Sequence, residues 1–378
     1  MKLKMRLRTL SQITVAGIVL FLTISHLKYG IEKAAPIDAY CPFGAIEGFL
    51  TYLFTGEYLK RIYASSFILM GVLLVSTLVF GRVFCSYFCP LGAIQEWMRS
   101  FGRKIGIKKD VELPERIDKA GRYLKYVILA IVIYYSYIIG DLVFRAYDPF
   151  NALMHFGEEF DEKIFGYSIL GILLLASLFS KNWWCRYFCP LGATFAIFKK
   201  ISPFKISRNV SSCTSCGICA RTCPANLPVD KSNEIKSADC ISCLNCVPSC
   251  QNGSLRANIF GREISKVKFS LIVISAFFLP LFIFMATPLW QVKMPSNIVD
   301  TKGELDMTNL RGSNTLQYLL DTTKIPFIVF EEKLHLPGDI DKSLKLKDIG
   351  SKYEIKKEDG SYLEMEDFRT VVEEYIAN

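Results

Sequence analysis

Histidine and charged residues are scarce in this 378-residue sequence, and the scarcity argues against several classes of protein. There are three histidines and no Cys-x-x-Cys-His motif, so covalent haem attachment is excluded and a haem held by His26 and His155 is disfavoured. No Gly-x-Gly-x-x-Gly follows a predicted strand, which argues against binding of NADH or flavin by this chain. Charged residues make up 21% and the mean hydropathy is +0.28, values that favour a membrane protein.

Five apolar segments have the length, alone or with aromatic neighbours, to form membrane-spanning helices, each of which needs roughly 20 residues. They cover residues 10–27, 64–81, 126–140, 164–180 and 269–292. The first follows a basic stretch and is not succeeded by a small-residue cleavage site, so we interpret it as a retained helix. We predict a mainly α-helical membrane protein with about five transmembrane helices. Long buried helices of a soluble protein are the alternative.

Lysine and arginine are unevenly distributed among the connecting segments. Residues 82–125 contain ten and residues 181–268 contain thirteen, whereas residues 141–163 contain two. The positive-inside rule places the first two segments in the cytoplasm and the third outside. We therefore predict a multi-pass protein of the cytoplasmic (inner) membrane. Its N-terminus lies inside, and the part that follows the fifth helix lies outside.

Eight of the 13 cysteines form two runs with the spacing Cys-x2-Cys-x2-Cys-x3-Cys. This spacing is typical of bacterial two-cluster ferredoxins, in which the first three cysteines of a run hold one [4Fe–4S] cluster and the fourth holds the other. A zinc site uses spaced pairs and a disulfide framework suits short secreted chains, so both alternatives are disfavoured. We predict that one cluster is ligated by Cys213, Cys216, Cys219 and Cys250, and the second by Cys240, Cys243, Cys246 and Cys223.

The other five cysteines belong to a duplicated part of the chain. Residues 81–93 read GRVFCSYFCPLGA and residues 181–193 read KNWWCRYFCPLGA. A second duplicated motif precedes each of these. It reads AYCPFGA at residues 39–45 and AYDPFNA at residues 146–152, with Asp148 in the position of Cys41. Internal duplication often builds a pseudo-symmetric bundle with a site at the repeat interface. We predict such a bundle here.

Each Cys-x3-Cys pair places two thiols at positions i and i+4, on one face of a helix that the next proline breaks or kinks. Four such thiols can hold a metal or a third cluster, or form a redox-active dithiol. Packing as small buried side chains is the alternative. The predicted membrane site comprises Cys85, Cys89, Cys185 and Cys189. We expect Cys41 and Asp148 near the outer face, away from the pairs, and include them in the site only if their turns re-enter the membrane.

The duplicated Cys-x3-Cys-Pro motifs and the two ferredoxin runs together resemble membrane polyferredoxins of the NapH/NosR type. The resemblance covers about residues 10–265. It implies an electron-transfer subunit that connects the quinone pool or a cytoplasmic donor with a membrane or extracytoplasmic redox partner. Quinone is therefore a candidate cofactor. Tyr134, Tyr135 and Tyr137 are candidates to line its site, although aromatic residues at a membrane boundary explain them equally well.

Two other functions fit the sequence. The membrane thiols suit a metal-handling or assembly factor that binds or reduces copper, because soft thiolates favour Cu(I). The second of these functions is that of a redox sensor, which would transmit the state of its clusters to a partner through the acidic C-terminal domain. The basic residues flank apolar segments, so membrane lipid, and not nucleic acid, is the expected partner.

We divide the chain into four parts. Residues 1–205 form a membrane domain with four helices, residues 206–262 an α+β ferredoxin domain, and residues 263–292 the fifth helix. Residues 300–378 form a small, mostly helical domain. Residues 293–378 carry a net charge of −5 against +14 for the rest, and they contain no cysteine and no acid–base constellation. We therefore expect docking or packing from the tail and no catalysis.

Overall fold

The computed structural model describes most of the chain. It covers residues 2–33, 37–49, 52–53, 62–139, 142–155, 164–290, 292, 305, 307, 310, 312, 314–357 and 361–377. Residues 156–163 of the predicted outer loop and residues 293–304 lie outside this part. The chain forms two compact units, Met1–Val292 and Lys293–Asn378.

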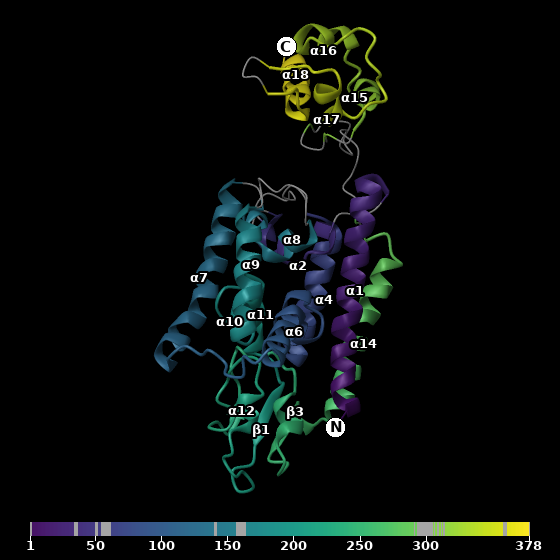
Figure 1. Ribbon diagram of the computed structural model, residues 1–378. Helices are drawn as coiled ribbons and strands as arrows, with labels where there is room; N and C mark the ends of the chain where they lie inside the picture. Colours follow the sequence, from purple (N-terminus) through teal and green to yellow (C-terminus); the bar gives the residue numbers. More distant parts are fainter. Residues whose placement is uncertain are drawn as a thin grey trace. The chain divides into compact units, whose positions relative to one another are not determined.

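Most of each predicted apolar segment lies in a helix of the first unit, and the fifth segment continues beyond the end of its helix at Met285. These helices are α1 (Lys2–Lys33), α4 (Ala64–Phe80), α7 (Glu115–Ile139), α9 (Ile164–Phe179) and α14 (Lys266–Met285). Figure 1 shows that α1 and α14 both begin at the end of the bundle that carries the small sheet. Three stretches, Leu7–Lys28, Glu115–Ile139 and Lys266–Met285, are long and apolar enough to cross a membrane, while α4 and α9 are shorter apolar helices. The mainly helical fold is confirmed, and five spans stay a prediction.

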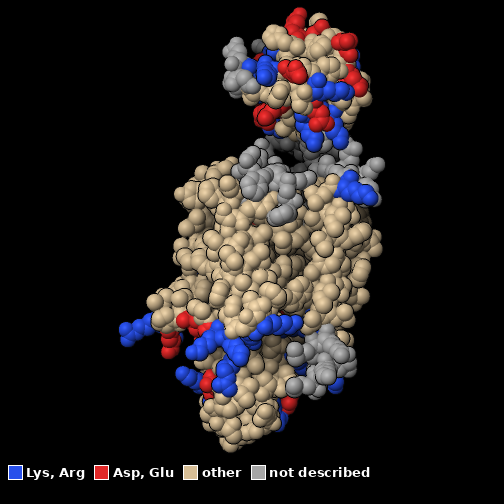
Figure 2. Space-filling view, viewed as in Figure 1, with Lys and Arg blue, Asp and Glu red and all other residues tan. Residues whose placement is uncertain are grey.

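The outward faces of these helices are apolar. Large side chains such as Phe21, Ile138 and Phe282 are 58–68% exposed, which suits contact with lipid. Figure 2 shows few charges on the helical body, and lysines and arginines gather where this body meets the sheet. A basic border beside an apolar body is typical of a membrane boundary.

The two repeats fold alike, and in both of them a proline begins a helix. The first contains η1 (Ile37–Tyr40), α2 (Pro42–Glu47), α4, α5 (Val83–Tyr87) and α6 (Pro90–Lys104); the second contains η2 (Val143–Ala146), α8 (Pro149–Met154), α9, α10 (Trp183–Tyr187) and α11 (Pro190–Lys199). Proline suits the first position of a helix because its missing N–H would have no partner there. As a result Cys85 lies in α5 but Cys89 is the cap of α6. The spacing suggested that both thiols lie on one helix, but the two cysteines belong to different helices.

A four-stranded antiparallel sheet carries the segment with the two ferredoxin runs. Its strands are β1 (Lys205–Arg208), β2 (Glu234–Ile235), β3 (Leu255–Ile259) and β4 (Arg262–Glu263), in the order β2-β1-β3-β4. Because Arg208 pairs with Leu255, β1 and β3 bring the two ends of this segment together. The short helices α12 (Ile218–Arg221) and α13 (Cys246–Ser249) each begin within a run.

The ferredoxin segment and the helical body share one hydrophobic core. Phe269 of α14 has its ring centroid 6.1 Å from that of Phe80 of α4 and 5.1 Å from that of Phe204, beside β1. The same cluster of buried residues includes Cys240 and Cys243. Cysteines of the ferredoxin runs thus belong to the same core as the long helices.

The second unit is helical and has a core of its own. Its helices are α15 (Leu316–Thr323), α16 (Phe327–Leu334), α17 (Leu346–Lys352) and α18 (Met365–Ala377). Leu316, Phe330, Leu346 and Phe368 are fully buried in this core. The predicted division of the chain into four parts stays a prediction.

Candidate functional site

The structure groups the eight ferredoxin cysteines into the two predicted sets of four. One hollow, of about 80 Å³, is lined by Cys213, Cys216, Cys219 and Cys250, and another, of about 20 Å³, by Cys223, Cys240, Cys243 and Cys246. The fourth cysteine of each run therefore crosses to the other set. No three His, Cys, Asp or Glu side chains among the described residues could hold a single metal ion. Four thiols that converge on one hollow are the donor set that a [4Fe–4S] cluster takes, so the chemistry of each set fits a cluster.

Matching backbone turns make the thiols of each run converge. Ser215 and Ser242, between the first two cysteines of their runs, have φ of 56° and 53°. Gly217 and Leu244, which follow the second cysteine, have φ of 68° and 54°. Left-handed conformations are costly for residues other than glycine and are held where the surrounding structure requires them. Both runs thus adopt the same tight turn.

The two sets differ in exposure. Cys216 is exposed, whereas all four cysteines of the second set are buried. In the first set, Arg208 donates to Cys213 Sγ at 3.5 Å and the Ser254 N–H donates to Cys250 Sγ at 3.3 Å. Burial raises the pKa of Cys223 in the second set to about 12. That thiol loses its proton readily only when a metal group compensates the charge.

The four membrane cysteines meet at the interface between the two repeats. Cys85 and Cys185 are buried, Cys89 and Cys189 are half-buried, and the four lie within electrostatic reach of one another. Gln95, from the first repeat, donates to Cys185 Sγ of the second at 3.2 Å. The predicted grouping of these four residues thus appears in the fold, and what they bind stays a prediction.

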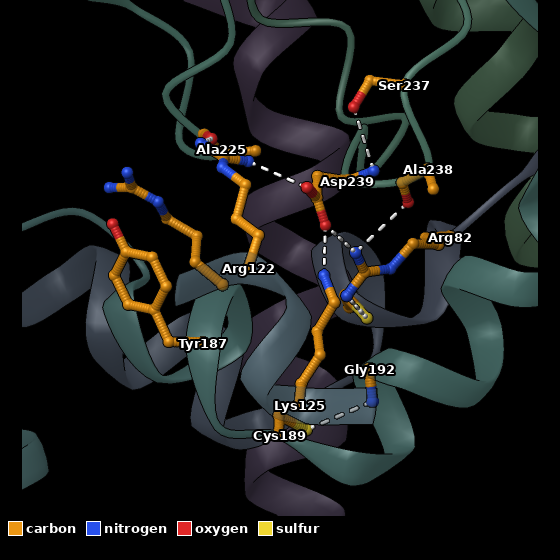
Figure 3. Close-up of polar contacts among 12 residues, drawn as sticks. Arg82, Arg122, Lys125, Tyr187, Cys189, Gly192, Ala225, Ser237, Ala238 and Asp239 are labelled. Atoms are coloured by element: carbon orange, nitrogen blue, oxygen red, sulfur yellow. Dashed lines mark hydrogen bonds and ion pairs between the residues drawn. The ribbon is translucent and has the colours of Figure 1, made fainter. Parts of the chain in front are cut away.

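A buried charge cluster joins this region to the second ferredoxin set (Figure 3). Asp239, next to Cys240, forms ion pairs with Lys125 and with Arg122 (3.0 Å), both of α7. Arg82 Nη1 lies 3.5 Å from Asp239 Oδ1, and its Nη2 lies 3.9 Å from Cys85 Sγ. Burial acts to raise the pKa of Asp239, but Lys125 and Arg82 outweigh it and hold this pKa below its usual range.

We expect Asp239→Asn to destabilise the protein by about 3–5 kcal/mol, because it leaves buried cations without their counter-charge. The measurement is the free energy of unfolding of the purified protein in detergent. Glu263→Gln is the matched control, since the Arg256–Glu263 pair is 61% and 54% exposed and such pairs contribute about 0–1 kcal/mol. Equal losses in the two variants would contradict the prediction.

An apolar cavity of about 380 Å³ lies within the helical body. Side chains of α1, α14 and both repeats line it, including Phe84, Phe88 and Trp184. Cys89 and Cys189 form part of its wall. The cavity therefore borders the membrane cysteine site.

Cys41 and Asp148 line this same cavity. They directly precede α2 and α8, which pack on α4 and α9. Whether they belong to the membrane cysteine site stays a prediction. Tyr134, Tyr135 and Tyr137 are 44–59% exposed and are not among the cavity's lining residues. These tyrosines therefore fit aromatic residues at a membrane boundary better than residues of a quinone site.

Sequence reasoning missed Arg82, Lys125, Asp239 and the cavity. Arg82 and Asp239 are 157 positions apart, so no local pattern pairs them. For Arg82, the available signal was its position directly after an apolar segment. A charged side chain that is buried usually has a partner.

Known proteins share the cysteine pattern. A family model described as a 4Fe-4S binding domain matches residues 64–108 and 163–209, in both repeats, and one described as a 4Fe-4S dicluster domain matches residues 205–251. The putative electron transport protein YccM of Escherichia coli is 30% identical over 281 residues, which cover 71% of this chain and 78% of YccM. The chain belongs to the YccM family.

Other relatives confirm the predicted resemblance of this YccM-family chain to NapH and NosR. The ferredoxin-type protein NapH of Haemophilus influenzae is 30% identical over 45% of this chain and 59% of NapH. The regulatory protein NosR of Pseudomonas aeruginosa is 31% identical over 53% of this chain and 27% of NosR. No solved structure is significantly similar to the chain. The protein is a membrane-associated protein of the ferredoxin type with 4Fe-4S binding domains.

Proposed function

We propose that this protein passes electrons through the membrane, between a cytoplasmic donor or the quinone pool and a membrane or extracytoplasmic redox partner. One observation carries the proposal. Arg82 lies between the second ferredoxin set and the membrane cysteine pairs: its guanidinium reaches Asp239, the neighbour of Cys240, on one side and Cys85 on the other. Electron transfer through a protein requires redox centres that lie close to one another.

Each ferredoxin set would hold one [4Fe–4S] cluster, a group that supplies one-electron transfer without making or breaking substrate bonds. The protein's part is to hold the thiolates, set the spacing and control access. Cys216 is exposed, which supports access of a soluble partner to the first set. The buried second set lies against the helical body.

We propose that the membrane cysteine site, Cys85, Cys89, Cys185 and Cys189, holds a further [4Fe–4S] cluster. Two observations support it: the four thiols gather at the repeat interface, and the 4Fe-4S binding domain model matches both repeats. Copper handling is less well supported, because the family model that matches both repeats is that of a 4Fe-4S binding domain.

The apolar cavity supports exchange with the quinone pool. Pockets for small ligands are mostly apolar, with volumes of about 300–1,000 Å³ and a few polar groups that fix orientation. This cavity has about 380 Å³, aromatic walls, and Asp148 as a polar group. Its wall contains Cys89 and Cys189, so a quinol bound there would lie beside the membrane cysteine site.

We further propose that the ferredoxin domain faces the cytoplasm and the acidic domain lies outside. The lysines and arginines at the sheet end of the bundle support this orientation (Figure 2). The direction of α14, which begins at that end, supports it as well (Figure 1).

The test is iron and acid-labile sulfide per chain in anaerobically purified protein. We expect about twelve irons, about four for each cubane. Cys216→Ser should lower the iron content, and serine at all four membrane cysteines should remove about four irons. Cys41→Ser is the control and should remove none, although Cys41 lines the same cavity as Cys89. Iron unchanged in Cys216→Ser would overturn the ferredoxin assignment, and about eight irons in the wild type would overturn the membrane cluster alone.

A further inference from the structure

Arg82 and Asn182 occupy equivalent positions in the two repeats. Each precedes the first cysteine of its pair, Cys85 or Cys185, by three residues, and each is the cap residue of the short helix that carries that cysteine. Both side chains are buried, with 1% and 3% exposure. Two large polar side chains are therefore buried beside the membrane cysteine site.

Parts of both side chains lack hydrogen-bond partners. Among the described residues, none pairs with Arg82 Nε or with either polar atom of the Asn182 amide. A buried polar group left unsatisfied costs about 1–3 kcal/mol. Such groups in a folded protein call for an explanation, and an absent bound group is one of the standard ones.

Asn182 does not serve as an ordinary helix cap. Asparagine is favoured at this position because its side chain accepts a hydrogen bond from a helix N–H. The side chain of Asn182 makes no such bond, and its backbone has a left-handed φ of 40°. The side-chain amide of Asn182 therefore does not cap the helix. Together with Arg82, Cys185 and Asp239 it lines a narrow hollow.

The chain leaves room for the Arg82 guanidinium among the thiols. A Cβ at Gly192 would lie 2.9 Å from Arg82 Nη2, and the Gly192 N–H donates to Cys189 Sγ at 3.3 Å. Figure 3 shows Arg82 with dashed contacts to Asp239 and Ala238 on one side and to a sulfur atom on the other. Glycine thus allows a cation to approach the cysteines of both repeats.

We propose that Arg82 and Asn182 donate N–H hydrogen bonds to the sulfur atoms of the cluster held by the membrane cysteines, and that they raise its reduction potential. The inference rests on the proposed membrane cluster. Hydrogen bonds to cluster sulfurs and nearby positive charge favour the reduced state, which is the more negative one. Arginine is not deprotonated in proteins, so its contribution is constant with pH. Arg82 and Asn182 are positioning and tuning residues, and they are not ligands.

A purely structural role for Arg82 predicts a different result. If Arg82 only tethered the Asp239 loop to α5, its loss would lower stability and leave the potential of the membrane cluster unchanged. Arg99 provides a matched comparison because it too is a buried arginine, 3% exposed, with an ion pair to Asp110 at 2.6 Å and a bond to Leu178 O at 2.9 Å. Arg99→Gln is expected to destabilise the protein without a change in that potential.

The experiment is an anaerobic redox titration of the full chain, followed by electron paramagnetic resonance. The membrane signal is defined as the one lost when the four membrane cysteines are serine. In Arg82→Gln we expect the ratio of reduced to oxidised membrane cluster at a fixed potential to fall about tenfold, which is about 59 mV for one electron. Arg82→Lys keeps the charge and should shift the potential less. Asn182→Gly keeps the left-handed backbone accessible and should shift it in the same direction as Arg82→Gln.

The outcomes separate the inference from the proposed function. A membrane signal that is present but unmoved in Arg82→Gln and Asn182→Gly would overturn the inference and leave the proposed function intact. A wild-type protein with no signal assignable to the membrane cysteines would overturn the inference and the third cluster, while the two ferredoxin clusters are judged by their own iron. If Arg82→Gln does not fold, Gly192→Ala serves instead, since the added Cβ displaces the guanidinium. It should lower the potential, and an unchanged potential would count against the inference.

Discussion

Serine at all four membrane cysteines is expected to slow reduction of the ferredoxin clusters by quinol more than about a hundredfold, because loss of outer partners alone costs about 10–100-fold at a metal site. These cysteines lie between the apolar cavity, which Cys89 and Cys189 line, and Arg82, which contacts the Asp239 loop. Removing the group they hold leaves a gap between the quinol and the second ferredoxin set. The ferredoxin sets themselves should keep their iron, since each is closed by its own loops.

The measurement is the anaerobic decrease in visible absorbance of the ferredoxin clusters after addition of a reduced short-chain quinol. Dithionite, which needs no membrane site, should reduce the variant and the wild type alike. Cys41→Ser controls for a change of thiol in the same cavity and should retain the wild-type rate. Fast reduction by quinol in the absence of all four cysteines would show that electrons enter by another path.

The ferredoxin part could be predicted from sequence because its determinants are local. Two-residue gaps between cysteines allow a tight turn, and the structure contains that turn twice, with left-handed residues at Ser215 and Ser242. The grouping of four, with Cys223 and Cys250 exchanged between runs, follows from the same spacing. The helical body was predictable for a similar reason, since apolar length alone identifies candidate spans.

The arrangement within the body was not predictable, because it depends on how short segments pack on the long helices. A parity argument placed Cys41 and Asp148 near the outer face. It did not predict that a proline after each of them begins a six-residue helix, or that both residues line the cavity whose wall contains Cys89 and Cys189. In the same way, the i and i+4 spacing put Cys85 and Cys89 on one helix, whereas Pro90 begins a new one.

The charge cluster at the ferredoxin boundary shows a second limit. Three distant segments contribute Arg82, Lys125 and Asp239. Taken alone, each of these residues would be interpreted as an ordinary charge at a membrane boundary. Their meaning arises only when folding buries them together, because a buried charge requires a partner. Tertiary contact, and not spacing, therefore decides which charges of this chain belong to the site.

Val19→Phe is expected to weaken quinol binding about tenfold, because extra volume in a formed site costs about 1–3 kcal/mol. Val19 lies on α1 and lines the apolar cavity, so the added ring occupies space that the quinol would use. The KM for quinol should rise more than kcat falls, since the substitution acts on binding. Iron content should not change, because no cysteine is altered.

The same substitution at Val75 provides the control. Val75 lies on α4 with 63% exposure and is not among the residues that line the cavity, so its larger side chain faces outward. Both variants are assayed with the same quinol and with dithionite, which separates entry through the cavity from direct reduction of the clusters. Equal KM values for Val19→Phe and Val75→Phe would mean that quinol does not use the cavity. A raised KM in Val19→Phe alone would support binding of the quinol in the cavity, whose wall contains Cys89 and Cys189.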